Sequence, residues 1–124
     1  MSRNYGVMCN VLDRIAKTRR HLEYDDFANI QQRDRVRDEL KRLSADGLID
    51  GAVEFGADGV CLVCAVKGLT DEGKAFYRLV ENARVRELAI STLREADIDV
   101  PYPLLKEVCE DIVKRYVTCF IPKI

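Results

Sequence analysis

Apolar residues recur along the chain at two spacings, and each spacing predicts a different kind of element. Between residues 4 and 17 they return every three or four positions, which is the period of one helix face. The same period predicts further helices at residues 32–45, 71–82, 84–96 and 101–117. A shorter helix is expected at Tyr24–Ala28, with Leu22 and Phe27 turned inward and Asn29 opening a turn.

Two segments rich in valine and phenylalanine, residues 52–55 and 60–66, are typical of β-strands. The intervening Gly56-Ala57-Asp58-Gly59 is a turn signal, so the segments are expected to pair as a hairpin. Gly47 suits the left-handed end of the helix before the hairpin. Thr70 suits the N-cap of the helix after it.

Three helices followed by a two-stranded hairpin are the layout of a winged helix-turn-helix. We therefore expect a mainly α fold with a small β-hairpin: a winged-helix domain at residues 1–82, and two C-terminal helices at 83–124 packed on it as one compact unit. The length of 124 residues suits one domain, and 48% apolar residues suffice for a core.

No membrane partner is expected. The longest uninterrupted apolar run, Val60–Val66, has seven residues, whereas a membrane-spanning helix needs about 20. The first ten residues lack the charged, apolar and small-residue order of a signal peptide. A cytoplasmic protein is the resulting expectation.

The cysteines are odd in number and irregularly spaced, at positions 9, 61, 64, 109 and 119. Cys61 and Cys64 form a C-x-x-C pair inside a predicted strand, where positions three apart point to opposite faces. On that geometry the two thiols do not bind one metal ion, and no second pair completes a tetrahedral site. The cysteines are thus interpreted as small buried apolar residues in a reducing compartment, with no metal and no cofactor.

Catalytic signatures are missing as well. The single histidine, His21, lies beside Arg19 and Arg20 in a predicted loop, with no spacing that suggests a third group to orient it. Asp25 and Asp26 are adjacent, which suits the start of a helix better than paired acid and base catalysis. Neither of the common glycine-rich phosphate-binding motifs occurs. We expect a protein that is not an enzyme.

Several short patterns resemble known sequences. Val36-x-x-Glu39-Leu40-x-x-Leu43-x-x-x-Gly47-Leu48-Ile49 resembles a winged-helix recognition helix running into its wing. The opening Met1-Ser2-Arg3-Asn4, the element Leu69-Thr70-x-x-Gly73-x-x-Phe76 and the tail Val100-Pro101-x-x-Leu104-Leu105-Lys106 are similar to a small uncharacterised bacterial and prophage winged-helix family. The resemblance covers most of the chain and implies a role in DNA regulation. The five cysteines depart from that family and leave a redox role open.

The charge distribution agrees with a DNA-binding regulator of transcription. Residues 1–44 carry 10 Lys and Arg against 7 Asp and Glu, whereas residues 45–124 carry 10 against 14. Arginine suits guanine edges and phosphates. If the chain binds double-stranded DNA, Arg19 and Arg20 are expected on phosphates, and the helix at 32–45 enters the major groove with Arg33, Arg37, Lys41 and Arg42.

Other features favour a winged helix that makes protein contacts or dimerises without binding DNA. Asp34 and Asp38 lie at the centre of the exposed face of the helix at 32–45, and the hairpin turn contains no Lys or Arg. The two helices at 84–117 exceed the minimal fold and offer a seam for a homodimer. The apolar residues 118–122, expected beyond the last helix, add to that surplus. Both functions remain open from the sequence.

Overall fold

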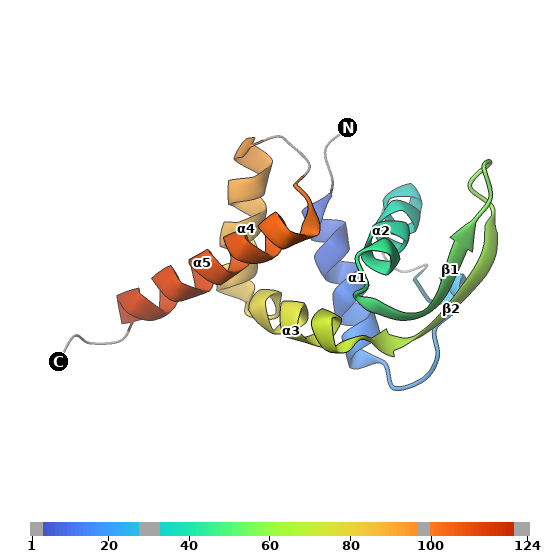
Figure 1. Cartoon of the computed structure of the whole chain (residues 1–124), viewed down its shortest axis with the longest axis horizontal. Helices are drawn as coiled ribbons and strands as arrows, with labels where there is room; N and C mark the ends of the chain where they lie inside the picture. The colour runs from blue at the N-terminus through green and yellow to red at the C-terminus, as the bar shows by residue number, and fades with distance from the viewer. Residues whose placement is uncertain (1–3, 28–32, 97–99, 121–124) are drawn as a thin grey trace.

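The computed structural model describes residues 4–27, 33–96 and 100–120 (Figure 1). Its elements follow in the order α1 (Tyr5–Lys17), the 3₁₀ turn η1 (Tyr24–Phe27), α2 (Arg33–Ala45), β1 (Ile49–Phe55), β2 (Cys61–Leu69), α3 (Asp71–Val80), α4 (Ala83–Ala96) and α5 (Tyr102–Phe120). The predicted mainly helical fold with one antiparallel hairpin is confirmed.

The differences from the sequence prediction lie at the ends of elements. Both strands extend beyond the predicted segments, to Ile49 and Leu69 at the base of the hairpin. Helix α5 continues to Phe120, so residues 118–120 belong to the helix and do not follow it. The turn expected at Asn29 lies outside the described residues, as do residues 97–99, between the last two predicted helices, and residues 121–122.

Polar caps fix where the helices begin. The Asn4 side chain accepts a hydrogen bond from the Val7 amide at 3.0 Å and caps α1. The Thr70 hydroxyl accepts from the Gly73 amide at 3.0 Å and donates to the Gly47 carbonyl at 2.6 Å. Thr70 therefore caps α3 and also ties it to the end of α2, where Gly47 has the predicted left-handed conformation with φ 76°.

One apolar core joins the N-terminal and C-terminal helices. Helix α1 runs through the middle of the molecule, with α2 and the hairpin on one side and α4 and α5 on the other (Figure 1). Its Val11 and Leu12 are fully buried, as are Leu40 of α2 and Phe76 of α3. The same cluster includes buried residues of the last two helices, Val85, Ala89, Leu93, Leu105, Cys109 and Ile112. Helices α4 and α5 thus share the core of the hairpin-bearing half.

A half-buried polar cluster fastens α1 to α3 and α4. Arg86 donates to both carboxylate oxygens of Asp13 at 2.7 Å, and the Tyr77 hydroxyl donates to Asp13 at 2.8 Å. Burial alone raises the pKa of Asp13, but the hydrogen bonds from Arg86 and Tyr77 outweigh it and hold that pKa below its usual value. Burial and the Asp13 carboxylate raise the pKa of Tyr77 to about 12. The cluster keeps Asp13 ionised and paired at neutral pH.

The hairpin has an irregular register and a third short partner. Leu22 forms an isolated antiparallel bridge with Val66, with N–O distances of 2.8 and 2.9 Å, so the segment before η1 lies beside β2. The pairing of β1 with β2 shifts at Asp50/Gly51 and again at Glu54/Phe55. Gly51 has φ 136°, and a Cβ atom there would collide with the Ala65 carbonyl, so the first irregularity requires glycine.

Candidate functional site

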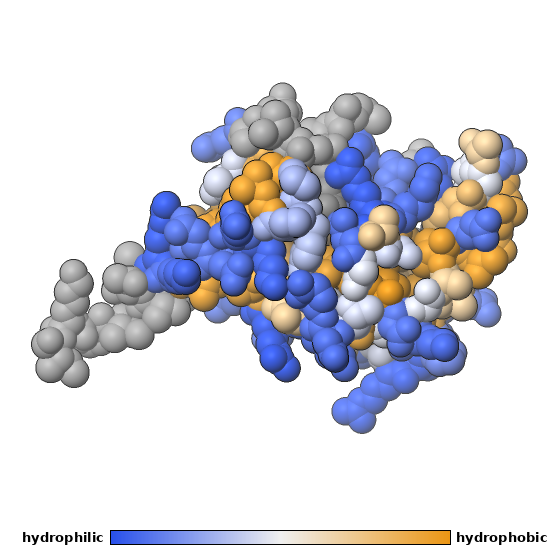
Figure 2. Space-filling view, viewed as in Figure 1, coloured by the Kyte–Doolittle hydropathy of each residue, from blue (hydrophilic) through white to orange (hydrophobic). Residues whose placement is uncertain are grey.

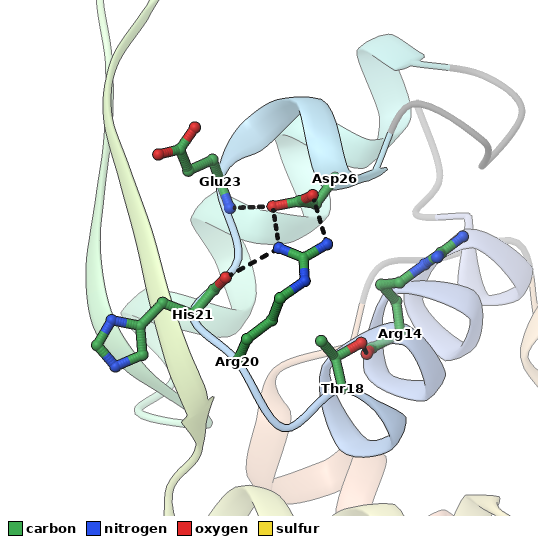
Figure 3. Close-up of polar contacts among 6 residues, drawn as sticks. All are labelled: Arg14, Thr18, Arg20, His21, Glu23 and Asp26. Carbon is green, nitrogen blue, oxygen red and sulfur yellow. Dashed lines mark hydrogen bonds and ion pairs between the residues drawn. The ribbon is translucent and has the colours of Figure 1, made fainter.

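Arg20, which was expected to contact a DNA phosphate, forms a bidentate ion pair with Asp26 of the same chain. Its two terminal nitrogens contact the Asp26 carboxylate at 2.9 and 3.2 Å, and one of them donates to the His21 carbonyl at 3.2 Å (Figure 3). The Glu23 amide donates to the same carboxylate at 2.7 Å. The hydrogen bonds from Arg20 and from Glu23 lower the pKa of Asp26 to about 2. Arg20 is thus paired within the chain, although 67% of its side chain stays exposed.

Arg37, expected in the major groove, reaches from α2 to the hairpin turn. Its guanidinium lies against Gly59, which has φ 83° and whose missing Cβ leaves the room that Arg37 occupies. The Arg37 Nε atom is also 3.7 Å from the Asp38 carboxylate, and only 27% of the Arg37 side chain is exposed. This arginine therefore joins α2 to the turn.

The remaining predicted cations are spread over different environments. Arg19 and Lys41 are exposed, and Arg42 is half-buried. Arg33 begins α2, and its side chain lies outside the described part of the chain. The exposed Asp38 carboxylate shares the surface of α2 with Lys41. A carboxylate therefore lies among the described cations of α2.

The outer face of the hairpin is apolar and exposed, which the sequence analysis did not identify. Leu62 is 60% exposed, Val60 55% and Val63 40%. Apolar residues cover much of the hairpin in the space-filling view, where it lies at the right (Figure 2). The signal was present in the unbroken apolar run Val60–Val66, because a strand with one solvated face normally alternates apolar and polar residues.

The hairpin also brings Cys61 and Cys64 to one face, which corrects the expectation that they point to opposite faces. Cys61 pairs with Phe55 and Cys64 with Val53, and the register shift between these pairs leaves Leu62 as an additional residue in β2. This bulge shifts the alternation of inward and outward side chains in β2 by one position, so that Cys61 and Cys64 point to the same side. Both cysteines are free and half-buried on the inner face.

This inner face lies against η1. Tyr24 of η1 and Phe55 of β1 form an edge-to-face ring pair with centroids 5.3 Å apart. Cys64 packs with them against the core. Burial, and to a smaller extent the neighbouring Cys61, Glu23 and Asp26, raises the pKa of the Cys64 thiol to about 11. Cys64 is therefore protonated at neutral pH.

No other candidate chemistry emerges in the described residues. Among them, no group of three His, Cys, Asp or Glu side chains could hold a metal ion. His21 is exposed on the loop before η1. Within the same residues, none of the helices combines the length and the hydropathy needed to cross a membrane.

Comparisons with protein-family models, with curated proteins and with solved structures find no match to this chain.

Proposed function

We propose that this chain is a winged helix-turn-helix protein that works through protein contacts, with the outer face of its hairpin as the contact surface and a second copy of the chain as its partner. The order α1, Leu22 bridge, η1, α2 and hairpin supports the winged-helix assignment, because the bridge pairs a segment between the first two helical elements with β2. The exposed apolar side chains of the hairpin carry the functional part of the proposal.

The contact surface is favoured by its exposed apolar side chains. Leu62, Val60 and Val63 are exposed together at one end of the hairpin. Fully burying a side chain of this kind is worth about 1.5–3 kcal/mol, so a partner that covers the exposed parts of these three gains a fraction of that value from each. Exposed apolar residues gathered in one place mark interaction surfaces more often than isolated ones do.

The small and charged residues of this face are placed so as to suit a second copy. Ala52 and Ala65 pair at its centre and are both exposed, so two such sheets can approach closely there. Glu54 lies toward the turn and Lys67 toward the base of the hairpin. In a two-fold arrangement whose axis runs across the strands, the turn of one copy meets the base of the other, which places each Glu54 near Lys67 of the second copy.

Sedimentation velocity over a range of protein concentrations tests this proposal. The wild-type chain is expected to form dimers, and the double variant Leu62→Ser, Val63→Ser to remain monomeric with an unchanged circular-dichroism spectrum. The matched control is Leu88→Ser with Leu104→Ser, which removes the exposed leucines of α4 and α5. A wild-type monomer at all concentrations, or dissociation by the helix variant in place of the hairpin variant, refutes the hairpin contact.

DNA binding along α2 is the second candidate, favoured by the exposed Lys41 and by the position of the hairpin beside α2 (Figure 1). Fluorescence anisotropy with random-sequence duplex DNA at about 50 and 200 mM salt tests it, because phosphate contacts make affinity fall steeply with salt. Arg37→Ala with Lys41→Ala should weaken binding to all sequences and flatten the salt dependence.

The matched control for DNA binding is Lys74→Ala with Arg78→Ala, which removes the same charge from the exposed face of α3. Equal losses in the two double variants indicate a general charge effect and reject α2 as the DNA-binding surface. Absence of wild-type binding at about 10⁻⁴ M protein, the weak end of ordinary non-specific affinity, rejects DNA binding altogether.

A further inference from the structure

We propose that Cys61 and Cys64 form a paired-thiol modification site, which a low-molecular-weight disulfide such as oxidised glutathione converts into an intramolecular disulfide. The inference is independent of the partner proposed for the hairpin. It rests on the pairing register of β1 and β2, on the exposure of the two thiols and on the irregularity between them.

The register places the two thiols on one face. Val53 and Phe55 are two positions apart in β1 and therefore point to the same side of the sheet. Residues directly opposite each other in an antiparallel pair share a face, so Cys64 opposite Val53 and Cys61 opposite Phe55 also share that side. The two thiols share a face because Leu62 is an additional residue in β2. In a regular strand, residues three positions apart would point to opposite faces.

The surroundings favour reaction at this pair. Cys9 and Cys109 are 2% and 1% exposed and lie in the core, whereas Cys61 and Cys64 are half-buried. A bulge leaves one residue without a ladder partner and bends the strand locally. A disulfide needs a Cα separation of about 4.4–6.8 Å, and the proposal requires the backbone at this bulge to adjust to it.

The reaction balances with the small disulfide as the oxidant. The Cys61 thiolate attacks one sulfur of the small disulfide, forms a mixed disulfide and releases one thiolate. The Cys64 thiolate then attacks the Cys61 sulfur and expels the second. The two protein thiols are oxidised to one S–S bond, and the small disulfide is reduced to two thiols that take up the two protons. The half-buried Cys64 acts second, because its pKa, raised to about 11 by burial, keeps its thiol protonated at neutral pH and slows its attack on the small disulfide.

Mass spectrometry after treatment with oxidised glutathione tests the site, in a chain that carries Cys119→Ser to remove the cysteine near the C-terminus. The intact chain is expected to lose the mass of two hydrogen atoms, to carry no glutathione, and to yield one peptide with Cys61 linked to Cys64. Dithiothreitol should reverse the change. Cys61→Ser and Cys64→Ser should each abolish the loss of two hydrogens.

A shifted pair provides the matched control. Val63→Cys with Cys64→Val brings the thiols closer in sequence but places them on opposite faces, because Val63 pairs with the outward Glu54. This variant is expected to stop at a glutathione adduct. The proposal is overturned if the native pair ends as a glutathione adduct or stays reduced, or if the shifted pair closes as readily as the native one.

Discussion

The guanidinium of Arg37 lies against the backbone of Gly59, so the middle of α2 and the turn of the hairpin are in direct contact. The contact depends on the missing side chain at position 59, where φ is 83° and a Cβ would meet Nη1 of Arg37. The contact holds the hairpin turn against α2. It involves Arg37, which the sequence pattern had predicted to contact DNA.

Gly59→Ala should therefore lower the free energy of unfolding by about 1–2 kcal/mol, the cost of holding a side chain in the left-handed region. Urea denaturation followed by circular dichroism measures this change. Gly68→Ala is the control, because a Cβ at position 68 meets no atom within 4 Å; it should alter stability by no more than about 0.5 kcal/mol. Equal effects of the two variants would contradict the strain at Gly59.

Gly73→Ala should cost about 1–3 kcal/mol, as expected for inserting a methyl group into a packed site. A Cβ at position 73 would collide with the carbonyl of Leu48, against which α3 begins. Thermal and urea unfolding measure the loss. Gly6→Ala, also in the first turn of a helix but in ordinary contact only, should raise stability by about 0.4–1 kcal/mol. A tolerated alanine at 73 would show that α3 can shift away from Leu48.

Asp13→Asn should destabilise the chain by about 1–3 kcal/mol at neutral pH, because it weakens hydrogen bonds to a charged partner, Arg86, that is only 20% exposed. Urea titrations of both proteins provide the comparison. Asp111→Asn removes the carboxylate of an exposed pair with Arg115, and such pairs contribute about 0–1 kcal/mol. A similar loss in both variants would mean that the Asp13 cluster does not hold α1 to α4.

The effect of Asp13 should also depend on pH. Its pKa is lowered in the folded state, so its contribution is complete above its unfolded pKa of about 3.9 and disappears as pH falls through the lower folded value. The stability difference between wild type and Asp13→Asn should therefore shrink below pH of about 4. A difference that stays constant down to acid pH would rule out ionisation of Asp13 as its source.

Closure of the Cys61–Cys64 disulfide should accelerate with pH. The pKa of Cys64 is raised to about 11 by burial and by Cys61, Glu23 and Asp26. The thiolate fraction, and with it the rate of the second step, should rise about tenfold per pH unit below that value. Acid-quenched mass spectrometry at neutral and mildly alkaline pH follows the conversion of the mixed disulfide. A rate independent of pH would place another step in control.

The local parts of the fold were predictable because their signals lie within a few residues of each other. The stripe from Val7 to Ile15 and the cap at Thr70 each specify a helix by themselves. The element Leu69-Thr70-x-x-Gly73 acquires a physical reason from the structure, since Thr70 starts α3 and Gly73 lets that start approach Leu48.

The candidate surfaces were less predictable because they depend on contacts between distant residues. The Arg37 side chain is directed by a turn in another element, and Arg20 by a carboxylate six positions ahead. The common face of Cys61 and Cys64 depends on which residues of β1 oppose them. Periodicity within β2 alone assigns them to opposite faces, since nothing in that strand marks Leu62 as the additional residue.

The bridge between Leu22 and Val66 bears on which edges of the sheet are open. At Val66 it occupies the free edge of β2, and β1 forms the opposite edge of the described sheet. β1 carries Asp50 and Glu54, and its pairing is interrupted at Gly51. Short, charged and irregular edges resist the addition of further strands. In the proposed dimer two copies meet face to face and the contact is closed, so the exposed Leu62 and Val63 would hold a pair together without starting a fibre.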